Sequence, residues 1–347
     1  MASTLNDTKR AAIGMQLSSI KAMQELLISN EQALIPLISD TEIRERFQKM
    51  LDDDQKNMGV LDTVIVQYGN PEEPKKTVTE FIKKVKELMA GSELSLYEKV
   101  FQHELLKHQQ AMSGIVVHKA AQKVGADVEA AITPLNTVNF ENRAHQEQWK
   151  GMLEVLGVRE LTGQEADQGL WARVQDAVAA LTGVAGSVVT QTSDKSDMNV
   201  QDVIRMDHQK VSTLFTELNQ SNDPQKIQEY FGQIYKDLMV HSKAEEQVVY
   251  PAIRSFYGDD NTQELYDEQA QMAVLLDEIK AIDPAHSEFK VKVNQLKDMV
   301  MDHVRQEEST MFIAIRNNCS SEQSEQLASQ FKAAKSQLQE ELKASFR

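Results

Sequence analysis

The feature that most constrains the fold is a stretch that occurs twice in the second half of the chain. It reads HSKAEEQVVYP from residue 241 and HVRQEESTMF from residue 303. In each copy a histidine, His241 or His303, precedes a glutamate, Glu245 or Glu307, by four residues. Residues four apart share one face of an α-helix, so each copy presents an imidazole beside a carboxylate. This pairing is typical of metal ligands.

The repeat also extends towards the N-terminus. The segment DHQKVSTLFTEL, from residue 207, aligns with EQAQMAVLLDEI, from residue 268, and their apolar positions coincide. Two helix pairs of one pattern therefore stand in tandem. We predict helices at 203–220, 225–256, 262–282 and 289–317, with lengths and connections that suit an up-down-up-down four-helix bundle. Bundles of this kind build metal sites in their cores from facing helices.

On these motifs the segment 198–318 resembles the hemerythrin-like (HHE cation-binding) domain. The resemblance implies a pair of non-haem iron ions in the bundle core, with imidazoles as terminal ligands and with oxo or hydroxo and carboxylate bridges. By position, His208 and His241 would hold one iron and His303 the other, with Glu245 and Glu307 bridging.

The third helix departs from the family pattern, because the repeat places Gln269 opposite His208. The neighbouring Glu268 is able to turn inward as an oxygen ligand. The predicted ligand set is therefore His208, His241, Glu245, Glu268, Gln269, His303 and Glu307. Such mixtures suit iron, and also manganese or zinc, while the absence of cysteine nearby argues against a structural zinc.

A plain amphipathic surface is the alternative explanation of the His-x3-Glu pairs. The apolar residues around His241 and His303 argue against it, because they place both imidazoles near a buried face. Buried imidazoles and carboxylates without partners are costly, so a metal or a complete polar network must satisfy them.

Composition sets the expected partners. The chain has 37 basic and 53 acidic residues and a net charge of −16, which we take to exclude nucleic acid and anionic membranes as partners. A single cysteine fits a reducing compartment, and neither a secretory signal nor a bilayer-spanning run is visible. We therefore expect a cytoplasmic protein, with a small diatomic molecule or a peroxide as its ligand.

The apolar periodicity predicts an all-α chain of two tandem helical bundles. In the first half we predict helices at 6–30, 40–68, 77–90, 94–123, 138–156 and 164–191, and loops at NPEEP, GADVEAAITP and GVRELTG. A polar linker places the boundary near 192–199. The domains are then an N-terminal helical bundle at 1–192, the hemerythrin-like bundle at 198–318 and an amphipathic C-terminal helix at 321–347.

The first half loosely resembles a ferritin-like carboxylate bundle. The resemblance rests on Glu25, the Asp52-Asp53-Asp54 run, His103, Glu104, His108, His118, Glu141 and His145. The alternative is a bundle without metal that serves packing or dimerisation. A homodimer would form through this domain or through the C-terminal helix.

Three function classes stay open on the sequence. In the first class, the metal pair binds O₂ or holds iron, for oxygen or redox sensing, iron handling or stress protection. In the second, the same pair is the centre of an enzyme that reduces peroxide, O₂ or nitric oxide. In the third, a single metal ion has a structural role. The second position is rich in oxygen ligands, which stabilise the oxidised metal and favour oxidation chemistry over reversible carriage.

Overall fold

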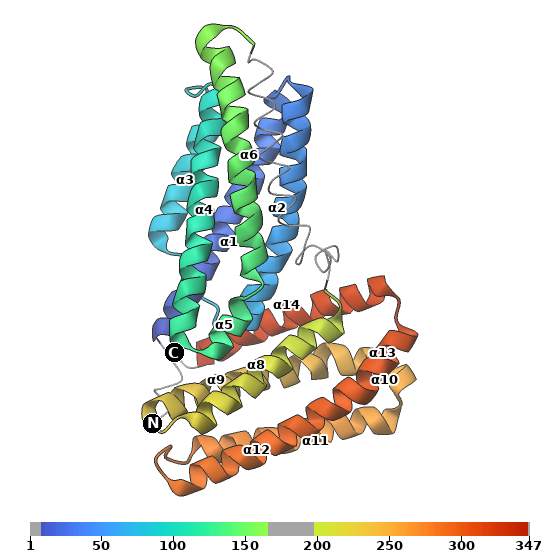
Figure 1. Cartoon of the computed structure of the whole chain (residues 1–347). Coiled ribbons are helices and arrows are strands. Elements are labelled where there is room, and N and C mark those ends of the chain that lie inside the picture. The colour runs from blue at the N-terminus through green and yellow to red at the C-terminus, as the bar shows by residue number, and fades with distance from the viewer. Residues whose placement is uncertain (1–7, 166–197, 346–347) are drawn as a thin grey trace.

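The computed structural model describes residues 8–165 and 198–345, and Figure 1 shows them as an N-terminal and a C-terminal group of helices. Within these ranges the chain forms helices and no strands, so the all-α prediction is confirmed. The N-terminal group contains α1 (Thr8–Leu34), a 3₁₀ turn (Ile35–Leu37), α2 (Thr41–Tyr68), α3 (Lys76–Ala90), α4 (Leu96–Val124), α5 (Ala126–Ile132) and α6 (Leu135–Thr162).

The C-terminal group begins with α8 (Val200–Gln220), α9 (Pro224–Ala244), α10 (Tyr250–Tyr257), α11 (Asp259–Lys280), α12 (Ser287–Gln306) and α13 (Phe312–Asn318). These helices form the predicted four-helix bundle, in which α10 continues α9 and α13 continues α12 (Figure 1). A last helix, α14 (Ser321–Ser345), follows the bundle. The predicted helix at 164–191 and the predicted boundary lie largely outside the described residues.

Side chains at the helix ends explain where the helices begin and stop. Asp40 accepts a hydrogen bond from the backbone N of Ile43 at 3.1 Å, which satisfies a free donor at the start of α2. The same helix ends at Gly69, whose φ of 77° is readily adopted only by glycine. Asn199 caps α8 in the same way through the backbone N of Asp202.

Two segments expected to be loops are helical. The segment after Gly125 forms α5, because Val128 and Ile132 lie fully buried in the apolar core beside α2 and α4. The GVRELTG segment continues α6 as far as Thr162, and the chain turns only at Gly163, which has a φ of 67°. Gly125 and Pro134 in the first segment and Gly157 in the second predict helix ends, whereas tertiary packing and the position of the cap decide the boundary.

The core of the C-terminal bundle has two apolar parts along the same helices. On α9 and its continuation, Leu238 belongs to one part and Val249 to the other, with His241 between them. On the paired helix, Val300 and Met311 enclose His303 in the same way. The paired histidines thus lie in a polar layer inside an apolar core.

Both His-x3-Glu helices contain a π-helical turn, at Glu245–Val249 and at Glu307–Met311. Each π turn begins at the glutamate of the motif and ends just before the aromatic residue, Tyr250 or Phe312. Single π turns inside α-helices are rare and occur frequently at functional sites. The two copies of the repeat therefore share a backbone irregularity at the predicted ligands.

Helix α14 lies between the two groups (Figure 1) and packs against α8, α9 and α2. Its Gln339 donates a hydrogen bond to the backbone O of Val66 at 2.8 Å. Directly between the groups, Lys210 of α8 donates to the backbone O atoms of Gln67 and Tyr68. The C-terminal helix therefore connects the metal-ligand bundle with α2.

Candidate metal centre

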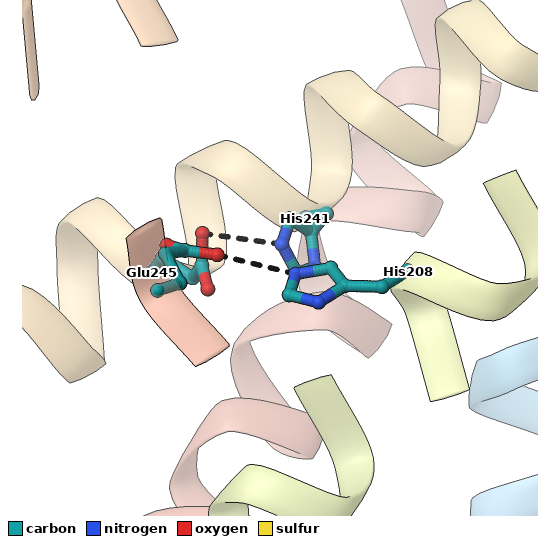
Figure 2. Close-up of side chains that lie close together, drawn as sticks. His208, His241 and Glu245 are labelled. Atoms are coloured by element: carbon teal, nitrogen blue, oxygen red, sulfur yellow. Dashed lines mark ion pairs between the residues drawn. The ribbon is translucent and has the colours of Figure 1, made fainter. Parts of the chain in front are cut away.

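Four predicted ligands converge in the core of the C-terminal bundle. His208 of α8, His241 of α9, Glu245 and Glu307 each offer a ligand atom, and these atoms all lie within 4.8 Å of one another. All four side chains are buried, and the two carboxylates are fully so. Figure 2 shows His208 and His241 turned towards Glu245. In the described part of the chain this is the group of side chains whose geometry suits a metal ion.

Outer carboxylates orient the imidazoles. Asp207 lies 2.8 Å from His241 Nδ1 and Glu308 lies 2.9 Å from His208 Nδ1. The Nε2 atoms then point inward, with His208 Nε2 3.1 Å from Glu307 and His241 Nε2 3.2 Å from Glu245. A carboxylate on one ring nitrogen fixes the tautomer and raises the basicity of the other, which is the usual environment of a metal-binding histidine.

The third histidine follows the same rule. His303 Nδ1 contacts Glu268 at 2.5 Å, and its Nε2 lies 3.3 Å from Glu307 Oε1. Glu268 thus lies on the outer side of His303, in the place that Asp207 takes beside His241. The repeat already aligned Asp207 with Glu268, and this alignment is the signal that could have identified both as orienting groups.

A tyrosine and a glutamine occupy the space that a further histidine would fill. Tyr250 Oη lies 2.9 Å from Glu307 Oε1, 3.2 Å from Glu245 Oε2 and 3.4 Å from His303 Nε2. Gln269 donates to Glu245 Oε2 at 2.7 Å and to Tyr250 Oη at 2.5 Å. Tyr250 is not among the ligands predicted from the sequence; the π turn that precedes it directs its hydroxyl to the carboxylates.

The ligand atoms have unmet hydrogen-bonding capacity. Glu245 Oε1 and Gln269 Oε1 are buried and have no hydrogen-bond partner, while His208 Nε2 and Glu307 Oε2 are buried and face only each other, at 3.1 Å. Buried polar atoms are normally paired, so each unpaired one requires an explanation. Two imidazoles and two carboxylates are suitable ligands for iron, manganese or zinc. The residues therefore fit a bound metal ion.

The electrostatics of the site also favour a cation. Burial alone would lower the pKa of His303, but the charge of Glu307 and the contact with Glu268 outweigh burial and raise it to about 10. Burial would raise the pKa of Glu307, yet His303 and His208 hold it well below its usual value. Protons on the imidazoles thus neutralise the carboxylates, and a metal ion would replace those protons.

Access to the centre is narrow. A cavity of about 20 Å³, lined by His208, His241 and His303, adjoins the ligands and has room for about one water molecule. A larger cavity of about 260 Å³ between α9 and α11 reaches Gln269 and shares Ser242 and Met272 with the small one. These volumes suit a molecule of the size of water or O₂ and exclude a polymer from the centre.

Helix α14 completes the surroundings of His241. Lys335 donates to both carboxylate oxygens of Asp207, at 2.5 and 2.7 Å, and its own side chain is buried. Burial would raise the pKa of Asp207, but Lys335 and His241 keep it below its ordinary range. Phe331 lies edge-on to the His241 ring, with the ring centroids 5.9 Å apart. Lys335, Asp207 and Phe331 are not among the site residues predicted from the sequence.

The N-terminal group contains a different polar core. His103, His145 and Asp54 of the predicted carboxylate cluster are buried there, but Lys107 Nζ contacts Asp54 and lies 3.4 Å from Glu31. Other members of that cluster lie at the surface, among them Glu25, Asp52 and His108. An ammonium group therefore provides the positive charge among these carboxylates.

The fold and the site define a hemerythrin-like metal-binding bundle. Residues 199–315 match the hemerythrin HHE cation binding domain. An uncharacterized hemerythrin-like protein of Schizosaccharomyces pombe (strain 972 / ATCC 24843) is 23% identical over 139 residues, which are 39% of this chain and 68% of that protein. No solved structure matches the chain.

A second relative matches nearly the whole chain. A protein of Nostoc sp. (strain PCC 7120 / SAG 25.82 / UTEX 2576) named DNA nickase is 66% identical over 342 residues, which cover 99% of this chain and 97% of the relative. This chain therefore belongs to the same protein family as the Nostoc DNA nickase, and its residues 199–315 form a hemerythrin-like domain.

This relationship corrects the expected partners. The prediction that nucleic acid is excluded is wrong, because the name of the full-length relative states an action on DNA. The prediction used the net charge of the whole chain, which does not describe the charge of a single surface. For the membrane, no helix among residues 8–165 and 198–345 has the length and apolar character needed to cross a bilayer.

Proposed function

We propose that the C-terminal bundle binds a pair of metal ions, with iron as the native metal and manganese or zinc as alternatives. His208 and His241 would hold one ion, and His303, with Gln269 and Tyr250 beside it, would face the other. Glu245 and Glu307 would supply carboxylate ligands to the pair. The observation that carries this proposal is the convergence of four buried ligand residues, His208, His241, Glu245 and Glu307, whose ligand atoms lie within 4.8 Å of one another.

The first test is the metal content of protein purified without air. We expect about two irons per chain, as in other carboxylate-bridged bundles. His208→Ala should lose metal, whereas Glu246→Ala should retain it, because Glu246 is exposed enough to pair with Lys243 outside the centre. Equal metal content in both variants would contradict the ligand assignment.

The reaction that we propose for the centre is electron transfer to O₂, peroxide or nitric oxide. Bound iron supplies the electrons, and the protein supplies oriented imidazoles and a path that admits only small molecules. Three histidines and several oxygen donors favour oxidation over reversible O₂ carriage. Stopped-flow mixing of the reduced protein with O₂ should give irreversible oxidation; a stable adduct that releases O₂ when the gas is removed would contradict the proposal.

We also propose that the chain nicks DNA, because its 66% identity to the Nostoc protein extends over almost all of both chains. The metal centre itself does not touch the DNA, since Glu245 and Glu307 are fully buried and the adjoining cavity holds about one water. Iron held by His208, His241, Glu245 and Glu307 would supply electrons to O₂ or peroxide and become ferric, so any oxidant that acts on the strand would have to diffuse from the centre.

Supercoiled plasmid provides the test. Iron-loaded protein should convert it to the open circular form in air, and His241→Ala should not. Hydrolysis at another surface would instead give His241→Ala full activity and nicks that DNA ligase can seal. Absence of open circles with the wild-type protein would contradict the nicking proposal and leave the metal proposal standing.

A further inference from the structure

The most basic surface segment of this acidic chain is helix α3 with the residue before it. Residues 75–90 contain five lysines and two glutamates, Glu80 and Glu87, whereas the whole chain has 37 basic and 53 acidic residues. The lysines are all exposed. Figure 1 shows α3 on the outer side of the N-terminal group, where it packs against α1. A positive surface of this kind attracts an anionic partner that the rest of the molecule repels.

One face of helix α3 is apolar and packs into the core of the N-terminal group. Ile82, Val85 and Met89, spaced three and four residues apart, pack into the core formed by α1, α4 and their neighbours. Lys76, Lys83 and Lys86 recur at intervals of seven and three residues, so they lie together on another face, and Lys75 adjoins them at the N-terminal end. We call Lys75, Lys76, Lys83 and Lys86 the lysine face.

The ammonium groups of the lysine face are not held in strong ion pairs within the protein. Lys76 approaches Glu80 only at 3.9 Å, with 89% of its side chain exposed, and Lys75, Lys83 and Lys86 form no ion pair within the described residues. An exposed pair of this kind contributes little energy. These ammonium groups are therefore ready to contact phosphate without first breaking strong interactions.

We propose that the lysine face is the surface on which duplex DNA docks, through its phosphates. This inference rests on the proposed nicking activity and adds the location of the DNA. Lys76 and Lys86 are about 15 Å apart along the helix axis, and one DNA strand presents a phosphate about every 3.4 Å of its axis, so several phosphates lie within reach. Such contacts position the duplex without selecting a sequence.

Charge reversal with a matched control tests the proposal. In one variant Lys76, Lys83 and Lys86 are changed to Glu. In the control Lys49, Lys119 and Lys226 are changed to Glu; these lysines are also exposed, but they lie on three separate helices. The two variants have the same net charge and differ only in whether the substitutions are clustered. Circular dichroism melts and metal content should match the wild type in both.

The readout is the anisotropy of a fluorescein-labelled DNA duplex, titrated at several salt concentrations. The clustered variant should bind at least about tenfold more weakly, and its log–log salt slope should be smaller by about 2.7, because each lost phosphate contact removes about 0.9. The scattered control should bind like the wild type. Replacing the same three lysines by Arg should preserve binding.

Two results would overturn the inference. Equal weakening in both variants would mean that only net charge matters, and unchanged binding in the clustered variant would place the DNA on another surface. In either case the wild type would still bind and nick DNA, so the proposed function would stand. A wild-type protein that neither binds nor nicks the duplex would instead remove the nicking proposal itself.

Discussion

Lys107 is fully buried in the N-terminal group and lies among groups that otherwise resemble metal ligands. Its Nζ contacts Asp54, lies 3.4 Å from Glu31 and 3.3 Å from His145 Nδ1. Burial would lower the pKa of Lys107, but the two carboxylates outweigh burial and raise it. The ammonium therefore stays charged at the position where a metal ion would balance the same carboxylates.

Removing this ammonium should destabilise the protein strongly. Lys107→Ala leaves Asp54 without its buried counter-charge, and breaking a buried ion pair from one side costs about 3–5 kcal/mol. Lys119→Ala, on the exposed face of the same helix, should change the free energy of unfolding by less than about 0.5 kcal/mol. Urea unfolding followed by circular dichroism measures both; equal midpoints would show that the cluster contributes no net stability.

Two neighbouring residues of this cluster predict a pH dependence. Burial raises the pKa of Glu31 to about 8, and burial lowers the pKa of His103 to about 3. A raised acid pKa favours the folded state at low pH, and this contribution is lost as pH rises towards 8. A lowered histidine pKa favours the folded state above its unfolded value of about 6.5, and this contribution is lost as pH falls.

The two effects oppose each other below about pH 6.5, and only that of Glu31 remains above it. Between pH 6.5 and 8 the wild-type melting temperature should therefore fall as pH rises. Glu31→Gln, which is neutral throughout, should have a flatter profile over the same range. Melts at intervals of half a pH unit test this, and parallel profiles for the two proteins would contradict the role given to Glu31.

At the scale of the element, helix α14 reaches into the metal centre through one lysine. Lys335 holds Asp207, and Asp207 holds His241 Nδ1 at 2.8 Å. Groups that orient a metal-binding histidine typically change metal affinity by about 10–100-fold when they are removed. The chain Lys335–Asp207–His241 thus makes α14 part of the metal centre.

Replacing Lys335 by Met should weaken metal binding by about tenfold, because the Asp207 carboxylate loses its buried partner. Lys332→Met is the control: Lys332 lies on the same helix but bonds Thr63 of α2 at 3.2 Å, away from the centre. Competition with a coloured chelator measures both affinities. Lys335→Arg should restore part of the affinity, and equal affinities in the two Met variants would contradict the positioning role.

The sequence predicts the elements better than it predicts their irregularities. Periodicity finds α2 and α3 within about two residues, because their apolar faces repeat every 3.6 residues. It does not find the π turns, since one extra residue per turn leaves no clear signal in so short a segment. It also misses Lys107 and Lys335, because lysine is normally exposed and its burial depends on partners far away in the sequence.

For the whole molecule, metal binding and folding should be linked. A ligand that binds only the folded state at 100 times its dissociation constant stabilises that state by about 2.7 kcal/mol. Denaturant unfolding of the metal-loaded protein should show a shift of this size, and the shift should vanish in His208→Ala. A shift that persists in this variant would place the stabilising metal elsewhere in the chain.

The position of α14 also determines which fragment of the protein is suitable for studying the metal centre. The matched domain ends at residue 315, so a fragment of residues 199–315 would contain His208, His241 and His303 and lack both Lys335 and Phe331. Such a fragment would report the chemistry of a centre that this protein does not contain. The smallest meaningful unit for metal titrations is the domain together with the helix that follows it.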